Sequence, residues 1–180
     1  GWTRGRRGPW VAGGVGAGTA VAWSGWKRVA CVDCDGHHGN APQAIFERVP
    51  RGMCVSSHQW PLYPGTGDET EHGTGNIVNG LLSPGEGSYE FRDLWSGLLL
   101  PHLDAFKPQL LLISAGFDAH ANDPLASLRL GQEDYAWVTD RLVALAREHA
   151  GGRSVTTWEG GYDLAALASC TRAHVQALRA

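Results

Sequence analysis

The sequence predicts an α/β fold in which a parallel sheet lies between two layers of helices. Two observations lead to this prediction. From residue 27 onward, short apolar runs alternate with stretches of helical periodicity, an order typical of parallel sheets with helices on both faces. The apolar runs are also continuous, as in strands that are buried on both sides. We therefore expect a three-layer α/β domain over residues 27–180, preceded by a segment of different composition.

Four strands are expected in this domain. Cys31 and Cys34 lie in the first of them and form a C-x-x-C, but in a strand residues three apart point to opposite faces. We therefore interpret them as buried thiols rather than as a metal or redox pair. The four cysteines are too irregularly spaced for a disulfide framework and favour a reducing compartment. The expected strands, each buried on both sides, cover residues 28–35, 52–58, 110–115 and 154–158.

Helices are expected between and after the strands. Residues 132–149 repeat apolar side chains at three- and four-residue steps, and two glycines follow as a helix end. Residues 88–106 form a second helix, which Pro101 must kink or break. A third helix runs over residues 163–178, with an aspartate as its cap. The glycine-rich stretch 63–79 is expected to be a long loop, either functional or disordered.

Residues 1–26 differ in composition from the rest of the chain. They hold eight glycines, four tryptophans and three arginines, and no acidic residue. A signal peptide is one interpretation, although the glycines would interrupt its apolar helix. A phosphate-binding loop is another, although no strand precedes the glycines and no Gly-Lys-Ser/Thr follows them. We favour an irregular Gly/Arg/Trp-rich arm.

Composition also bears on the class of protein. The formal net charge is −3, which gives the whole chain no electrostatic attraction to nucleic acid. No stretch approaches the roughly 18 consecutive apolar residues of a membrane-spanning helix. We expect a globular protein of the cytoplasm, with the nucleus as the alternative for a eukaryotic chain.

Polar side chains cluster where the first expected strand ends, in Asp33-Cys-Asp-Gly-His-His-Gly-Asn40. Parallel sheets place ligands and catalytic groups beyond the carboxyl ends of their strands. If the strand continued, Asp33, Asp35 and His37 would share one face, and two carboxylates with an imidazole would suggest a metal. The alternative is that the acids cap a turn and the histidines pack on a helix.

Two further strand ends extend this constellation. Asp118 follows the apolar run 110–115 and would complete a set of two carboxylates and one histidine, which leaves a tetrahedral zinc with an open position for catalysis. Tyr162 follows a pair of glycines at the fourth strand end, where its hydroxyl could stabilise an oxyanion. The alternative for Tyr162 is an ordinary half-buried aromatic side chain.

Five motifs occur in order: D-x-D-x-H-H-G-N, V-S-S-H, Y-P-G-T-G, S-A-G-F-D-A-H-x-x-D-P-L and E-G-G-Y-D-L. Over residues 27–180 the chain resembles the histone deacetylase and acetylpolyamine amidohydrolase family, of arginase-deacetylase fold. The resemblance implies that Tyr162 polarises an acetyl carbonyl. It also implies the ligands of two ions. Zinc would be bound by Asp35, His37 and Asp118, and a structural monovalent cation, usually potassium, by Asp33 and Ser56.

The resemblance implies zinc-dependent hydrolysis of N-acetylated amines, with an acetyl-lysine peptide or an acetylpolyamine as substrate. Related arginases bind two manganese ions through a longer set of aspartates. Here His120 and Asn122 follow Asp118, so one zinc per chain is expected.

One feature of the family is absent from the sequence. The family carries a tandem histidine pair, upstream of these motifs, that serves as general base and acid. No histidine precedes His37 in this chain. We therefore expect a truncated domain, its carboxyl-terminal half. A catalytically impaired fragment or a zinc-binding interaction module remains the alternative to a deacetylase. An exposed sheet edge would also favour self-association, and a homo-oligomer is left open.

Overall fold

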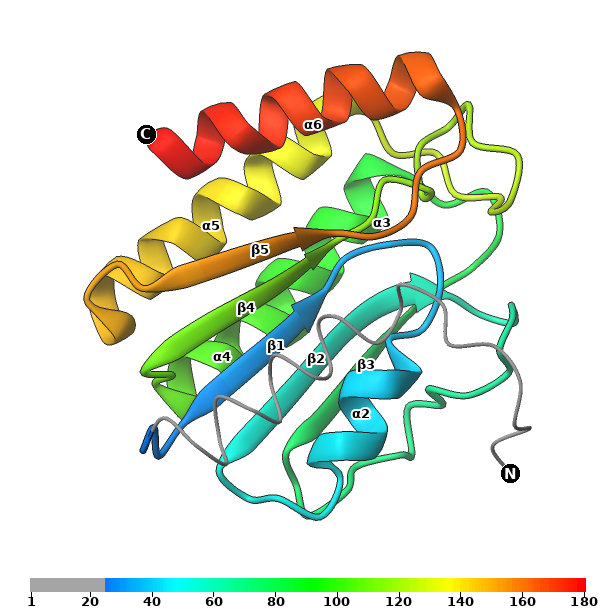
Figure 1. Ribbon diagram of the computed structural model, residues 1–180. Helices are drawn as coiled ribbons and strands as arrows, with labels where there is room; N and C mark the ends of the chain where they lie inside the picture. The colour runs from blue at the N-terminus through cyan, green and yellow to red at the C-terminus, as the bar shows by residue number, and fades with distance from the viewer. Residues whose placement is uncertain (1–24) are drawn as a thin grey trace.

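The computed structural model describes residues 25–180 (Figure 1). The arm, signal-peptide and phosphate-loop interpretations of residues 1–26 therefore fall outside the described residues, apart from Gly25 and Trp26. No helix in the described range combines the length and apolar character needed to cross a membrane.

The centre of the domain is a five-stranded parallel sheet in the order β3-β2-β1-β4-β5 (Figure 1). The chain adds β2 and β3 on one side of β1 and then β4 and β5 on the other. The boundary between β1 and β4 is therefore the point where strand order reverses, and ligands of open α/β sheets bind beyond the carboxyl ends of the strands at such a point. The strands are β1 Val29–Asp33, β2 Gly52–Gln59, β3 Ile77–Leu82, β4 Leu110–Ala115 and β5 Ser154–Trp158.

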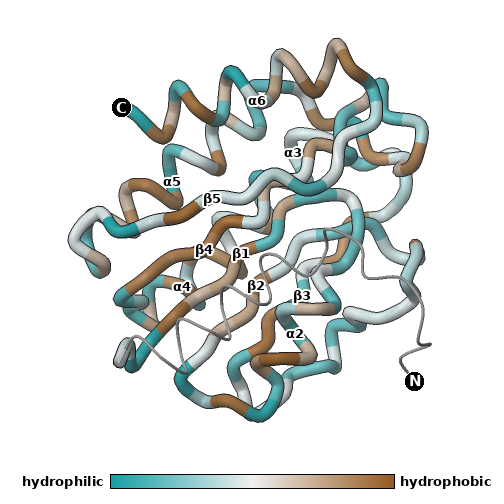
Figure 2. Tube along the Cα trace, viewed as in Figure 1, coloured by the Kyte–Doolittle hydropathy of each residue, from teal (hydrophilic) through white to brown (hydrophobic). Residues whose placement is uncertain are grey.

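Helices cover both faces of this sheet, as predicted. Figure 1 shows α2 in front of the sheet and α3 and α4 behind it, while α6 packs on α5. Figure 2 shows that hydrophobic residues follow β1 and β4 through the middle of the domain. The α/β prediction is therefore confirmed. The helical elements are α2 Asn40–Phe46, α3 Ser88–Leu94, the π-helical turn η1 Trp95–Leu99, α4 Leu100–Phe106, α5 Gln132–Ala150 and α6 Leu164–Arg179.

Two apolar clusters form, one on each face of the sheet. The larger lies behind the sheet, where Val32 and Ile113 pack with Trp95 and Leu142, and the smaller packs around Phe46 of α2. Cys31 belongs to the smaller cluster and Cys34 to the larger, and all four cysteines are buried and free. The interpretation of the C-x-x-C as two buried thiols on opposite sides is confirmed.

Three elements differ from the sequence expectation. The expected loop 63–79 ends early, because Ile77 begins β3 and pairs with Cys54 of β2. Helix α2 was not expected, since Pro42 interrupts its apolar pattern, yet proline is tolerated in the first turn of a helix. Strand β5 was expected to be buried on both sides, but among the described residues it is one of the two edge strands, and it is largely exposed.

The expected distortion near Pro101 is present. The helical run from Ser88 to Phe106 changes to π-helical hydrogen bonding over η1, directly before the turn that holds Pro101. Since proline cannot donate to the preceding carbonyls, a π-helical turn accommodates the lost hydrogen bond without ending the helix.

Strand β5 should promote self-association. Among the described residues it pairs only with β4, and Val155 on it is 51% exposed. Since an exposed apolar strand edge is a template for pairing, we expect Val155→Lys to lower the fraction of oligomer in sedimentation velocity. Val175→Lys is the matched control, because Val175 is 44% exposed on helix α6 rather than on a strand. Equal effects of the two variants would contradict the role of the edge.

His174 should make folding stability depend on pH. Its Nδ1 lies 2.7 Å from Thr139 Oγ1 and its Nε2 lies 2.9 Å from Thr156 Oγ1, and burial lowers the pKa of the imidazole. In the unfolded chain this histidine takes up a proton near pH 6.5, whereas in the folded chain it does so only at lower pH. The free energy of unfolding therefore falls as the pH decreases below about 6.5. Between pH 7.5 and 5 we expect the free energy of unfolding of His174→Gln, measured by urea titration, to fall less than that of the parent chain. The exposed control His72→Gln should behave like the parent chain, and parallel curves for all three proteins would refute this prediction.

Candidate metal centre

The chain turns sharply where β1 ends. Strand β1 stops at Asp33, so the expected continuation of the strand through Asp35 does not occur. Instead, the backbone N–H of Asp35 donates to Asp33 Oδ1 at 3.3 Å, and the N–H of His37 donates to Asp35 Oδ1 at 2.6 Å. Aspartate side chains commonly stabilise turns by accepting from the backbone two residues on. The turn, rather than strand alternation, brings the acids and His37 together.

Asp118 enters from the neighbouring strand β4. It is fully buried, its Oδ1 accepts from the backbone N–H of Gly36 at 2.6 Å, and its Oδ2 lies 2.8 Å from His37 Nδ1. Gly116 makes this approach possible, because a Cβ at that position would lie 2.2 Å from Asp35 Cβ. The ends of β1 and β4 are therefore tied together by direct contacts.

These side chains form a set that fits a zinc ion. Asp35, His37 and Asp118 offer donor atoms that all lie within 4.8 Å of one another. Burial, followed by the charges of Asp33 and Asp118, raises the pKa of Asp35 well above its usual range. Buried like charges of this kind need a bound cation or protons to neutralise them. Two carboxylates and one imidazole are zinc ligands, and three protein ligands leave a position open for substrate or water.

Asp33 and Ser56 lie side by side. The two residues are paired in the parallel register of β1 and β2, and both are buried. The backbone of Gly39 closes over them, since a Cβ there would lie 2.5 Å from Asp33 Oδ2. Burial, followed by the charge of Glu159, raises the pKa of Asp33. The structure therefore brings together the two residues that the resemblance assigned to a monovalent cation.

Two buried histidines, His58 and His38, link the Asp33–Ser56 pair to the glycine-rich loop. His58 Nε2 lies 3.0 Å from the carbonyl oxygen of Gly67, so this nitrogen carries the proton and donates. Its Nδ1 then accepts from the Ser56 hydroxyl at 3.0 Å, while Ser56 Oγ itself accepts from the backbone N–H of Gly39 at 3.4 Å. Burial lowers the pKa of His58 to about 4, and its ring packs 4.8 Å from the ring of His38.

His38 is fixed on both ring nitrogens. Its Nδ1 contacts Thr66 Oγ1 and its Nε2 contacts Gln43 Oε1, each at 2.8 Å. Gly67 packs directly on the two rings, because a Cβ there would lie 2.4 Å from His38 Cδ2. His38 therefore holds the loop rather than presenting a free imidazole to the metal centre.

Tyr162 lies at the rim of the site. The preceding Gly160 packs on Asp118, since a Cβ there would lie 2.6 Å from Asp118 Oδ2. The backbone N–H of Tyr162 donates to Asp123 Oδ2 at 2.7 Å, and the side chain is 43% exposed. Burial, followed by the charges of Asp118 and Asp35, raises the pKa of Tyr162. The phenol therefore stays protonated at neutral pH and is able to donate a hydrogen bond.

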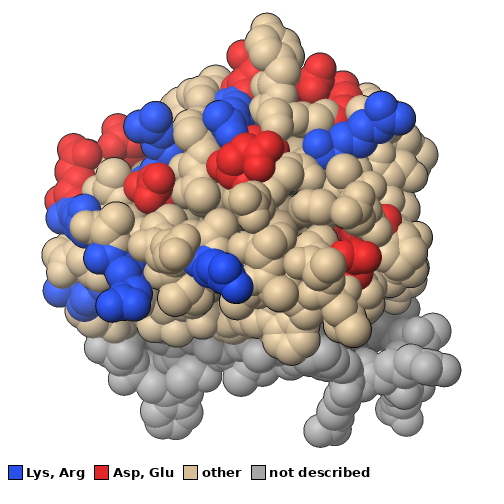
Figure 3. Space-filling model, turned by 90° about the horizontal axis from the view of Figure 1, so that it is seen from above, with Lys and Arg blue, Asp and Glu red and all other residues tan. Residues whose placement is uncertain are grey.

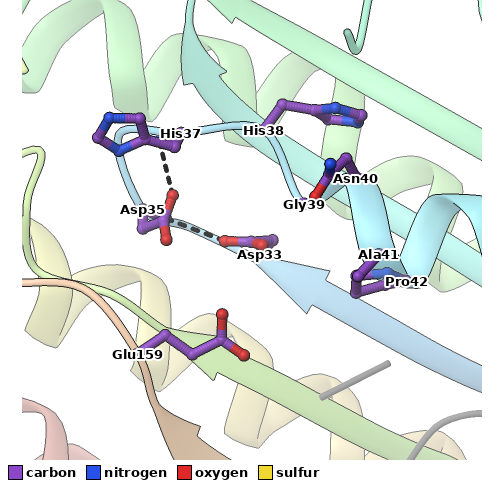
Figure 4. Close-up of a pocket in the computed structure, with 9 residues that line it drawn as sticks. All are labelled: Asp33, Asp35, His37, His38, Gly39, Asn40, Ala41, Pro42 and Glu159. Atoms are coloured by element: carbon purple, nitrogen blue, oxygen red, sulfur yellow. Dashed lines mark hydrogen bonds between the residues drawn. The ribbon is translucent and has the colours of Figure 1, made fainter. Parts of the chain in front are cut away.

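A small cavity beside the metal ligands contains one acid that the sequence analysis did not single out. Glu159 extends from the end of β5 toward Asp33 and Asp35, on the side of the cavity opposite Asn40 (Figure 4). Asp123, which anchors Tyr162, was also not singled out. Both had a signal in the sequence, since Glu159 is a carboxylate directly after a strand and Asp123 belongs to the S-A-G-F-D-A-H-x-x-D-P-L motif.

The fold and the site define an α/β protein with a candidate mononuclear metal centre at the carboxyl ends of its strands. The sequence profile of the family described as "Histone deacetylase domain" matches residues 14–178. The chain belongs to this family.

Its relatives include proteins of archaea and bacteria. A "Probable deacetylase" of Archaeoglobus fulgidus is 42% identical over 151 residues, which cover 80% of this chain and 42% of that protein. A "Histone deacetylase-like amidohydrolase" of Pseudomonas aeruginosa is 39% identical, with 88% of this chain and 43% of that protein covered. The crystal structure of the HDA15 HD domain has a TM-score of 0.80 and 35% identity, and covers 86% of this chain and 45% of its own. The chain spans less than half the length of these relatives.

Proposed function

We propose that the chain carries the zinc centre of a deacetylase that hydrolyses N-acetylated amines to acetate and a free amine. The single observation that supports this most is the convergence of Asp35, His37 and Asp118 in a member of the histone deacetylase family. Acetyl-lysine peptides and acetylpolyamines are the proposed substrates. Asp33 and Ser56 are the proposed ligands of a structural potassium ion, and the cytoplasm is the proposed compartment, with the nucleus for a eukaryotic chain.

Each residue of the site would have a separate role in this reaction. Asp35, His37 and Asp118 would hold the zinc ion, which when bound activates water and polarises the carbonyl group of the substrate. The hydroxyl of Tyr162 would donate a hydrogen bond to the carbonyl oxygen as negative charge develops on it. Asp123 would fix the backbone of Tyr162 through the hydrogen bond that it accepts.

The proposed reaction also needs a side chain that transfers protons to and from the substrate and water. No histidine precedes His37, and His38 has both ring nitrogens engaged. A positioned proton-transfer group contributes about 10²–10⁴-fold to the rate of an enzyme. The second candidate function is a zinc-binding interaction module that retains the site, which the engagement of both ring nitrogens of His38 favours.

Hydrolysis assays distinguish the two functions. We expect the purified chain with one zinc ion to hydrolyse an acetyl-lysine peptide or an acetylpolyamine slowly. We also expect Tyr162→Phe to lower that rate by about 10²-fold, which is typical for loss of a hydrogen-bond donor to an oxyanion. Tyr89→Phe is the matched control, since Tyr89 is 79% exposed on α3. Absence of turnover from the zinc-loaded chain, or turnover unaffected by Tyr162→Phe, would overturn the catalytic proposal.

A further inference from the structure

A second group of metal-ligating side chains lies away from the candidate metal centre. Asp104 in α4 and Glu148 and His149 in the last turn of α5 offer donor atoms that all lie within 4.8 Å of one another. Within residues 25–180 this group and the Asp35, His37 and Asp118 group are the two that meet this geometry. The two groups also have the same composition, two carboxylates and one imidazole.

The second group lies at the opposite end of the sheet from the first. Helix α4 ends at Phe106, four residues before β4 begins, and α5 ends at Ala150, four residues before β5 begins. Figure 1 shows the ends of α4 and α5 near the starts of these strands. Asp118, in contrast, follows the carboxyl end of β4, and a strand of six residues spans about 20 Å. A metal at one end therefore cannot share ligands with a metal at the other.

The local electrostatics favour a cation at the second group. Two helices have their carboxyl ends at this group: α4, which ends the helical run that begins at Ser88, and the 19-residue α5. The carboxyl end of a helix carries partial negative charge. No Lys or Arg among the described residues lies within ion-pair distance of Asp104 or Glu148. Arg147 and Lys107 are the nearest basic residues along the chain, and neither forms an ion pair with these two acids. Across the face seen in Figure 3, acidic and basic side chains are interspersed.

The imidazole is already oriented toward its partner. His149 Nε2 lies 2.8 Å from Asp104 Oδ1, and the His149 side chain is 11% exposed while that of Asp104 is 63% exposed. A largely buried histidine next to an exposed carboxylate provides one fixed ligand and room for water at the remaining positions. Imidazole with carboxylates suits zinc and similar divalent transition metals.

We propose that Asp104, Glu148 and His149 form a second, weaker zinc site that links the end of α4 to the end of α5. The site is independent of the proposed hydrolytic function. Asp104 and Glu148 are exposed to solvent, so the affinity is lower than at the buried centre, and occupancy depends on the free zinc concentration. Bound zinc would stabilise the folded chain by mass action, because the two helix ends come together only in the folded state.

Calorimetric titration of the metal-free chain with zinc chloride tests the proposal. We expect two binding events, a tight one that Asp118→Asn removes and a weaker one that His149→Gln reduces at least tenfold in affinity. Glu148→Gln should reduce the weaker event too, and because Glu148 is exposed this variant is expected to fold. His102→Gln, an exposed histidine of α4, is the matched control and should leave both events unchanged.

The outcomes are distinct. A single event in the parent chain would overturn the second site, as would a weak event that persists in both His149→Gln and Glu148→Gln. In those cases Asp104 and His149 form only an ion pair between the helices. Loss of the tight event alone in Asp118→Asn bears on the candidate metal centre and leaves the second site intact.

Discussion

Asp118→Asn should lower the zinc affinity of the buried centre by at least about 100-fold. Substitution of residues that merely orient metal ligands already costs about 10–100-fold, and Asp118 is itself a proposed ligand. Asparagine keeps an oxygen to accept from Gly36 N–H but replaces a carboxylate ligand with a neutral amide, which binds zinc more weakly. Competition for zinc with a coloured chelator measures the effect. The matched control is Asp140→Asn on the exposed side of α5, which should bind zinc like the parent chain.

Two results would count against this assignment. The first is an unchanged zinc affinity in Asp118→Asn. The second is equal loss in Asp118→Asn and Asp140→Asn, which would indicate a general effect of charge rather than loss of a ligand. Circular dichroism of each variant separates loss of the ligand from loss of the fold.

Gly116→Ala should destabilise the chain by about 2–3 kcal/mol, at the upper end of the range for overpacked interiors. The new Cβ would lie 2.2 Å from Asp35 Cβ. A Cβ is fixed to its backbone, so rotation of the Asp35 side chain cannot relieve the overlap, and β4 must move away from the turn after β1. We therefore expect zinc affinity to fall together with the free energy of unfolding, measured by urea titration and by zinc competition.

Gly97→Ala is the matched control for Gly116→Ala. Gly97 lies in the helical turn η1, and a Cβ there meets nothing within 4 Å. Alanine favours helix over glycine by about 1 kcal/mol, so this variant should be as stable as the parent chain or more stable. If Gly116→Ala were no less stable than Gly97→Ala, the close approach of β4 to the Asp35 turn would be wrong.

The convergence of Asp35, His37 and Asp118 could be predicted because their signals are local. Asp35 and Asp118 each follow a continuous apolar run, and the carboxyl ends of parallel strands gather at one edge of the sheet. The resemblance placed Asp33 with Ser56, and the register of β1 and β2 accounts for that pairing physically. The turn that orients His37 could not be predicted from the sequence, since it depends on hydrogen bonds that the side chains of Asp33 and Asp35 accept from the backbone.

Elements without a pattern of their own were missed. Helix α2 has seven residues and includes Pro42, which is too short and too irregular for helical periodicity. Strand β3 contains Asn79 and Gly80, so its apolar run is broken, and backbone pairing with β2 defines it. The exposure of β5 follows from its place at the edge of the sheet, because strand order is a tertiary property that composition does not encode.

Zinc K-edge X-ray absorption on the chain loaded with one zinc ion tests the central claim most directly. If Asp35, His37 and Asp118 hold the ion, the spectrum should show only oxygen and nitrogen neighbours at about 2.0–2.2 Å, with the multiple-scattering signature of one imidazole. The four cysteines are buried and free in the structure. Sulfur neighbours at about 2.3 Å would show that thiolates bind the metal and would contradict the assigned site.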